Sequence, residues 1–309
     1  MIHFTRRKFL KSSSILVAAT MVVPSFELKK VNPSLSFSTL GCPDWNFQKI
    51  TDFAVQNNYT GIELRGIQRE MDLSKSPIFN SAENIRNTLD IMKQKGLKFI
   101  NLGSSCNLHL SDAAARNKNL EEGRRFIDLA QKIDCPYIRV FPNKLPDEEE
   151  KKETLDRITS GLSELGDHAK GSNVTVLMET HGDVVMSDDI RYIMDAAAKE
   201  HTGLVWDIAN MWSVTKELPA EVYPKLKKYI LHTHIKDLKM KDGKEHYAFV
   251  GKGEVPIFEA IDILSKDGYK GYYSFEWEKM WHPEIEEPEV ALADYARAMK
   301  KHFSESPAT

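Results

Sequence analysis

Cysteine is scarce in this sequence of 309 residues, which contains only Cys42, Cys106 and Cys135. An odd number cannot pair completely, and none of the three stands in a Cys-x-x-Cys spacing. A disulfide framework is therefore excluded as the basis of the fold. An excess of basic residues is also missing, because 42 lysines and arginines face 45 acidic residues and the formal net charge is −3. A nucleic-acid surface needs concentrated positive charge, so we expect no nucleic-acid partner.

Two further absences concern the organisation of the chain. No linker, low-complexity tract or shift in composition divides residues 31–309, so we expect a single domain there. No glycine-rich phosphate turn follows the first predicted strand, which argues against an open, doubly wound nucleotide-binding sheet. The remaining length, about 280 residues, is enough for one large barrel.

The first thirty residues carry a pattern of their own, and we expect residues 1–30 to be a signal segment. The run Arg6-Arg7-Lys8-Phe9-Leu10-Lys11 resembles the twin-arginine export signal, which carries folded proteins across a membrane. The apolar stretch behind it, Ile15 to Val23, is too short for a permanent membrane span. We therefore expect an exported, periplasmic protein. The alternative is an amphipathic leader on a cytosolic protein.

Beyond residue 34, strand and helix patterns alternate without interruption. Short apolar runs predict strands, and apolar residues at helical spacing predict a helix after each strand. The predicted strands cover 35–40, 61–64, 97–102, 137–141, 174–179, 202–207, 229–234 and 272–276. The predicted helices lie near 46–57, 85–92, 126–133, 155–165, 188–198, 220–228, 256–265 and 289–303. Strict alternation implies parallel strands, and eight such units predict an α/β fold, the closed (β/α)₈ TIM barrel.

The last four predicted strands each end on a side chain that can bind a metal ion. These residues are Glu179, Asp207, His234 and Glu276. A parallel barrel brings the carboxyl ends of its strands to one rim, so the four should meet there. Three carboxylates and one imidazole suit one divalent metal ion such as Mn²⁺, Zn²⁺, Co²⁺ or Mg²⁺. The alternative is that each is an ordinary polar residue at a strand end.

Further polar residues are predicted to contact the substrate at the same rim. They are Glu63, His109, His181, Asn210, His232, Lys236 and His246. Side chains two apart on a strand share a face, so His181, His232 and Lys236 should point the same way as the ligands near them. The turn Gly251-Lys252-Gly253 can bind an anion through backbone N–H groups. The alternatives are packed strand histidines and an ion pair between Lys236 and its neighbour Asp237.

Taken in order, several motifs resemble the xylose isomerase-like TIM barrels of the sugar phosphate isomerase/epimerase superfamily. The motifs are Gly61-Ile62-Glu63-Leu64-Arg65, Met178-Glu179-Thr180-His181, Trp206-Asp207-Ile208-Ala209-Asn210, His232-Thr233-His234-Ile235-Lys236-Asp237, Gly251-Lys252-Gly253-Glu254-Val255 and Ser274-Phe275-Glu276. The resemblance covers the chain from Leu35 to Phe303. By analogy with ketose 3-epimerases of this group, it implies that Glu179 and Glu276 are the catalytic acid/base pair as well as metal ligands. The sequence departs from those epimerases at Asn210, where they have a histidine.

The chemistry expected of such a site is proton transfer at the carbon next to a carbonyl. A carboxylate removes the proton, and a divalent cation stabilises the resulting enediolate. Return of the proton to the opposite face makes the enzyme an epimerase, and return to the neighbouring carbon makes it an isomerase. Loss of a β-substituent makes it a lyase or dehydratase, for which a keto-sugar, keto-glycoside or inosose is the expected substrate. The partner is a small carbohydrate, and the sequence leaves a homo-oligomer open.

Two rival functions use the same fold. The first is a metal-dependent phosphodiester endonuclease, which needs several metal ions, more histidine ligands and a basic face for DNA. The negative net charge and the few histidines at strand ends disfavour it. The second is a non-catalytic sugar-binding barrel, and the presence of both Glu179 and Glu276 disfavours that.

Overall fold

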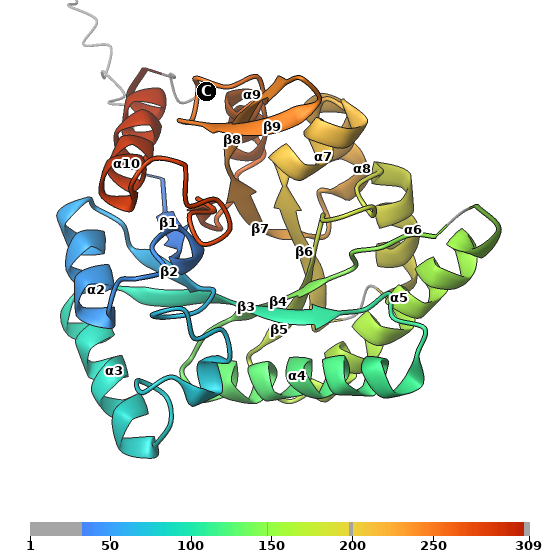
Figure 1. Ribbon diagram of the computed structural model, residues 1–309, viewed down its shortest axis with the longest axis horizontal. Helices are drawn as coiled ribbons and strands as arrows, with labels where there is room; N and C mark the ends of the chain where they lie inside the picture. Colours follow the sequence, from blue (N-terminus) through green and yellow to red (C-terminus); the bar gives the residue numbers. More distant parts are fainter. Residues whose placement is uncertain (1–32, 147, 198–199, 306–309) are drawn as a thin grey trace, which may run out of the picture.

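The computed structural model describes residues 33–305 except 147 and 198–199. Within these ranges eight parallel strands close into a barrel, and helices surround it (Figure 1). The order around the barrel is β1-β10-β7-β6-β5-β4-β3-β2, so successive barrel strands are neighbours and β10 closes onto β1. The predicted TIM barrel is confirmed. The predicted signal segment lies outside the described residues.

The barrel strands are short segments with mostly buried side chains. Their bounds are β1 Leu35–Ser38, β2 Gly61–Leu64, β3 Lys98–Asn107, β4 Tyr137–Phe141, β5 Thr175–Glu179, β6 Thr202–Asp207, β7 Ile230–Ile235 and β10 Tyr273–Phe275. The parallel register aligns their carboxyl ends, since Asp207 lies opposite His234 and His234 lies opposite Ser274. The last residues of β5 and β6, the end of β7 and the residue after β10 therefore share one rim.

The helices pack their apolar faces on this barrel. Their bounds are α2 Phe47–Gln56, α3 Ala82–Gln94, α4 Ala113–Lys132, α5 Glu148–His168, α6 Ser187–Ala197, α7 Ile208–Thr215, α8 Pro219–Leu226, α9 Ile257–Lys266 and α10 Pro288–Glu305. Asn46, Ser81 and Asp112 each accept a first-turn backbone N–H, which fixes where α2, α3 and α4 begin. None of the helices in these ranges has the length and apolarity that a membrane crossing requires.

Helix α9 illustrates how the pattern produces the packing. Its buried residues Ile257, Ala260, Ile261 and Leu264 follow the spacing of one helix face. Burial of each isoleucine or leucine side chain contributes roughly 1.5–3 kcal/mol through removal of apolar surface from water. The periodicity that predicts this helix from the sequence is therefore also what attaches it to the barrel.

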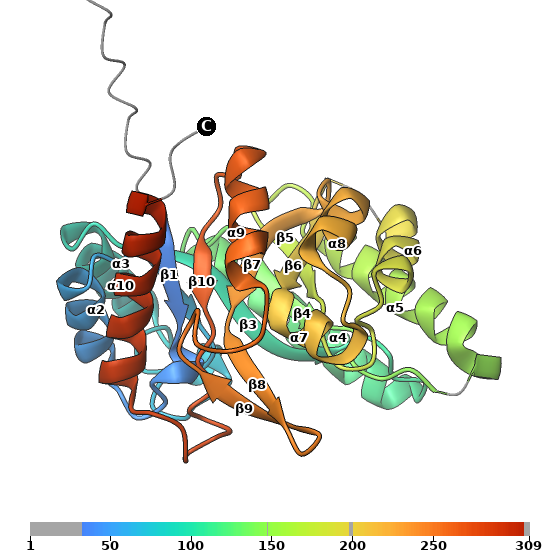
Figure 2. The same cartoon turned by 90° about the horizontal axis from the view of Figure 1, so that it is seen from above.

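Besides two short 3₁₀ helices, Thr39–Gly41 and Leu73–Lys75, a helix and a hairpin are present that the sequence pattern did not predict. The first is helix α7, which begins directly after β6. The second is an antiparallel hairpin of β8 (Asp237–Lys241) and β9 (Lys244–Ala248), which follows β7. Its turn residues Asp242 and Gly243 both have positive φ, as a tight two-residue hairpin turn requires. The hairpin projects beyond the barrel at the end opposite the entry into β1 (Figure 2).

Candidate active site and metal centre

Four side chains at the carboxyl rim converge on one point. Glu179, Asp207, His234 and Glu276 are all buried, and each contributes one potential ligand atom within 4.8 Å of the others. The Nδ1 atom of His234 lies 2.9 Å from Glu179 Oε1, 3.3 Å from Glu276 Oε1 and 4.0 Å from Asp207 Oδ2. The structure thus brings together the four residues that the strand ends predict.

Asp207 uses its two carboxylate oxygens for different tasks. Its Oδ1 atom accepts the backbone N–H of Asn210 at 2.8 Å and so caps helix α7. Its Oδ2 atom faces the cluster and lies 2.9 Å from Lys236 Nζ. The Thr180 hydroxyl also accepts the Asp207 backbone N–H and donates to the Asp207 carbonyl. Asp207 is therefore held at the rim through both its main chain and its side chain.

Two buried cations hold the two glutamates of the cluster. Arg139, on β4, places Nε 3.0 Å from Glu179 Oε2 and donates from Nη1 to the Ser104 carbonyl. Its guanidinium also lies 3.7 Å from the centre of the Phe141 ring. Lys236 lies 2.9 Å from Glu276 Oε2. Each glutamate thus has one oxygen near a permanent cation and the other near His234.

Lys236 also ties the cluster to the more exposed edge of the rim. Its ammonium lies 2.6 Å from Glu278 Oε1, and the Glu278 side chain is 16% exposed. Burial and the neighbouring Glu278 carboxylate raise the pKa of Tyr247, on β9, so the hairpin lies against this edge. Lys236 therefore pairs with Asp207, Glu276 and Glu278 rather than with Asp237.

The donor set fits a divalent cation. Glu179 Oε2 and Asp207 Oδ2 are buried without a well-directed hydrogen bond in the described chain, although each lies within 3.0 Å of a cationic group. Four carboxylates, those of Glu179, Asp207, Glu276 and Glu278, contact the two permanent cations Arg139 and Lys236 and so outnumber them. This surplus of buried negative charge favours a dication. The donor set of three carboxylate oxygens and one imidazole nitrogen also suits such an ion. Glu179, Asp207, His234 and Glu276 are the residues that would hold it.

The charges in the cluster displace the pKa values of its members. Burial alone would raise the pKa of Glu179 and Glu276, but the positive charge on His234 helps to hold both below their usual range. Burial, together with the charges of Glu276 and Glu179, raises the pKa of Asp207 to about 7 despite the opposing effect of Lys236. Burial lowers the pKa of His234, yet the surrounding carboxylates raise it well above its usual value. Without a bound ion, a proton on His234 therefore supplies part of the missing positive charge.

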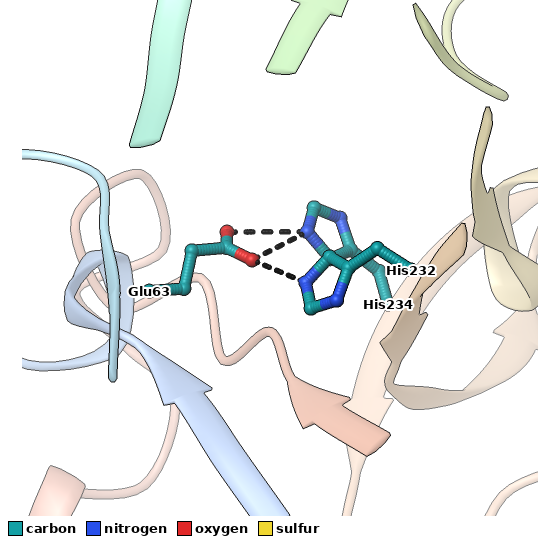
Figure 3. Close-up of side chains that lie close together, drawn as sticks. All are labelled: Glu63, His232 and His234. Carbon is teal, nitrogen blue, oxygen red and sulfur yellow. Dashed lines mark hydrogen bonds and ion pairs between the residues drawn. The ribbon is translucent and has the colours of Figure 1, made fainter. Parts of the chain in front are cut away.

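Glu63, on β2, lies on the other side of the His234 ring. Its Oε2 atom is 2.8 Å from His232 Nε2 and 3.1 Å from His234 Nε2. Figure 3 shows both imidazole rings directed at this carboxylate. Ser274 donates to the same oxygen at 3.4 Å. Burial alone would raise the pKa of the Glu63 carboxyl, but the charge on His234 and the imidazole N–H donors lower it. Glu63 and His232, both predicted as substrate contacts, thus lie buried against the metal-ligand candidate His234.

The other predicted substrate residues occupy different places. His181 is half-buried beside the cluster, with Nδ1 2.7 Å from Asn143 Oδ1 and its ring 4.4 Å from the Phe141 ring centre. Asn210 lies on α7, and its side chain donates to the Thr180 carbonyl. His109 follows β3, and its carbonyl accepts from Arg157. His246 is exposed on β9. Only His181 among these four presents an imidazole next to the cluster.

The Gly251-Lys252-Gly253 turn does not offer its N–H groups to an external anion. Gly251 and Gly253 both donate to Asp237 Oδ2, at 2.9 and 2.8 Å. Val255 donates to Asp237 Oδ1 at 3.2 Å. An added Cβ at Gly253 would lie 1.9 Å from that same oxygen, so the turn is built around the Asp237 carboxylate. The predicted anion site at this turn is wrong, because an internal carboxylate already fills it.

The sequence interpretation missed Arg139 and the role of Glu278. Arg139 stands in the otherwise apolar strand Tyr137–Phe141, and a charged residue in a buried strand requires a partner. This charged residue within an apolar strand was the feature of the sequence that could have revealed the role of Arg139. Gly103 provides the space, since a Cβ there would lie 2.6 Å from Arg65 Cδ and 3.0 Å from Arg139 Nη2. Two buried guanidinium groups thus pass side by side under the rim.

Comparison with known proteins agrees with this architecture. Residues 51–302 match the family described as Xylose isomerase-like TIM barrel. L-ribulose-5-phosphate 3-epimerase UlaE of Escherichia coli strain K12 is 29% identical over 192 residues, which cover 60% of this chain and 66% of UlaE. The match thus spans slightly less than two thirds of that relative's length.

Solved structures share the fold at lower identity. The IOLI protein with a bound zinc atom superposes with a TM-score of 0.72 at 16% identity, over 88% of this chain and 98% of that one. The probable 3-DHS dehydratase AsbF from Bacillus anthracis superposes with a TM-score of 0.69 at 18% identity, over 86% of this chain and 98% of that one. With a closed barrel, a buried cluster of potential metal ligands at its rim and a family match over most of its length, this chain belongs to the xylose isomerase-like TIM barrel family.

Proposed function

We propose that this chain is a divalent-metal-dependent sugar isomerase or epimerase that moves a proton at the carbon next to a carbonyl. The observation that carries the proposal is the position of Glu179 and Glu276. Both are buried carboxylates that approach His234 Nδ1, one from β5 and the other from the end of β10. In the barrel order β7 and β6 separate these strands, so the two carboxylates reach the site from different sides. Such a pair suits removal of a proton on one side and its return on the other.

The surrounding residues fix the positions of this pair. Arg139 holds Glu179, and Lys236 holds Glu276, so neither carboxylate needs to reorganise when a proton moves. A divalent cation, when bound by the four rim residues, supplies a Lewis acid that stabilises negative charge on the substrate oxygens. His181 lies half-buried at the edge of the cluster, which supports the proposal that its imidazole contacts a substrate hydroxyl.

The relatives support a small keto-sugar as the substrate. UlaE is a 3-epimerase of a sugar phosphate, and the IOLI structure contains zinc. AsbF is described as a dehydratase, so the lyase alternative also has a structural relative. Epimerisation, isomerisation and elimination of a β-substituent all begin with the same proton abstraction. They differ in where the proton or the leaving group goes afterwards.

Metal analysis followed by solvent-deuterium incorporation tests the proposal. We expect the purified protein to retain a single divalent ion per chain and to incorporate deuterium next to the carbonyl of some members of a panel of keto-sugars and keto-glycosides. Product analysis then separates an epimer, a shifted carbonyl and an unsaturated product. If the metal-loaded protein binds a sugar but exchanges no proton, the barrel is a binding protein and the proposal fails.

We further propose that the Arg6-Arg7 pair directs export of the folded chain. Replacing both residues with lysine is expected to leave the protein in the cytoplasm, because the twin-arginine pathway depends on the arginine pair rather than on charge alone. Cell fractionation measures the outcome. Replacing Lys29 and Lys30 with arginine is the matched control and should leave export intact. Unchanged export of the Arg6→Lys, Arg7→Lys double variant would assign the protein to another pathway.

A further inference from the structure

Glu63 contacts only one side of the His234 ring, and this determines which nitrogen is free for a ligand. The ring of His234 places Nε2 3.1 Å from both Glu63 oxygens, and dashed lines in Figure 3 mark these contacts. The other ring nitrogen, Nδ1, lies 2.9 Å from Glu179 Oε1. An ionised carboxylate is an acceptor only, so the nitrogen that faces Glu63 must carry a hydrogen. A neutral His234 then has its lone pair on Nδ1, which is the nitrogen among the rim carboxylates.

The carboxylate of Glu63 is itself held in place. His232 approaches Oε2 at 2.8 Å, and Ser274 donates to the same atom at 3.4 Å. His232 and His234 lie two positions apart on β7 and so point to the same face of the strand. Glu63 and His232 are buried to 0% and 1% exposure, which leaves no room for a substrate between them. Glu63 therefore acts on the ring of His234 rather than on a sugar.

We infer that Glu63 is a positioning residue, which fixes the Nε2–H tautomer and the orientation of His234 so that Nδ1 is presented to the metal ion. A carboxylate behind a metal-bound histidine is a general way of orienting the ring and raising its basicity, and its loss typically lowers metal affinity roughly 10–100-fold. The inference rests on the proposed metal-dependent function. It also accounts for why a glutamate stands in the buried interior of the barrel, where an unpaired charge would be unfavourable.

Zinc affinity of the full-length chain tests the inference without recourse to activity. Glu63→Gln keeps the size of the side chain but replaces one acceptor oxygen with a donor amide. Because His234 Nε2 is 3.1 Å from both oxygen positions, the amide NH₂ group faces the Nε2–H of His234 in either orientation and disfavours that tautomer. We expect the dissociation constant for zinc to rise roughly 10–100-fold. Ser274→Ala is the matched control, because it removes the hydroxyl donor to Glu63 while leaving both imidazole contacts. It should change zinc affinity by no more than a few-fold.

A second measurement does not depend on the folding of a variant. In wild-type protein labelled with ¹⁵N-histidine and loaded with zinc, long-range ¹H–¹⁵N spectra should show His234 with hydrogen on Nε2 and zinc on Nδ1. The signals are assigned by their loss in His234→Gln. Hydrogen on Nδ1, or unchanged zinc affinity in a folded Glu63→Gln variant, overturns the inference while leaving the metal site intact. Two zinc ions per wild-type chain, falling to one in Glu63→Gln, would instead make Glu63 a ligand. Failure of the wild type to bind any divalent ion would overturn the proposed function as well.

Discussion

Glu276→Gln should abolish most proton exchange between substrate and solvent while leaving the barrel folded. The substitution keeps the shape of the side chain but removes the charge that pairs with Lys236 and the basicity that accepts a proton. Loss of a catalytic base typically costs roughly 10²–10⁴-fold in rate, and we expect an effect in that range. The measurement is solvent-deuterium incorporation at saturating metal, so that weakened metal binding is not mistaken for lost chemistry. Glu179→Gln should behave similarly if the two carboxylates act as a pair.

Glu278→Gln is the matched control for this prediction. Glu278 shares Lys236 with Glu276, but it lies outside the group of potential metal ligands and is partly exposed. The Glu278→Gln substitution should lower the rate of proton exchange between substrate and solvent only a few-fold. His181→Ala should spare the metal and mainly raise KM, because His181 lies beside the cluster without joining it. Wild-type exchange rates in both Glu276→Gln and Glu179→Gln would show that neither carboxylate is the base.

Arg139→Met should cause a large loss of stability in the metal-free chain. The side chain is 1% exposed and forms an ion pair with Glu179, which is equally buried. Removing one partner of a buried ion pair leaves the other charge uncompensated, which typically costs about 3–5 kcal/mol. Chemical denaturation in the presence of a chelator measures the effect on the metal-free chain. Addition of Zn²⁺ should reduce the difference, since a dication at Glu179 would restore part of the compensation.

Two further variants serve as comparisons for the stability of Arg139→Met. Arg297→Met removes an exposed arginine that pairs with Asp294, and it should change stability by no more than about 0.5 kcal/mol. Glu179→Gln in the Arg139→Met background removes the stranded charge and should recover part of the loss. If Arg139→Met and Arg297→Met are equally stable, the buried pair contributes nothing to the fold, and its role is confined to orienting Glu179.

The sequence was sufficient to predict the barrel and the positions of four rim residues. Alternating strand and helix patterns imply parallel order, and parallel order sends every strand end to one rim. Because Glu179, Asp207 and His234 fall on or beside strand ends, their convergence followed from topology alone. The cluster in the structure contains those residues together with Glu276.

Contacts across the barrel could not be predicted in the same way. Glu63 and His232 are 169 positions apart, and no local pattern reveals that their side chains meet. The partners of Lys236 likewise depend on side-chain length and rotamer, so its pairing with Glu278 instead of Asp237 was open. The hairpin after β7 was missed for a different reason. Asp242-Gly243 is a strong hairpin-turn signal, but a search for barrel strands alone passes over it.

Because Arg139 and Lys236 lie among the buried carboxylates, we expect the barrel to fold without first binding an ion. Small zinc domains remain unfolded until the ion arrives, because the ion supplies the free energy of folding. Here two internal cations already offset part of the carboxylate charge, so the barrel can close first and take up its ion last. The identity of a bound ion would then depend on which metals surround the folded chain when it binds one, since donor sets of this kind accept several divalent ions. Under the proposed function, the compartment in which the folded chain binds its ion would decide which metal stabilises the charge on the substrate.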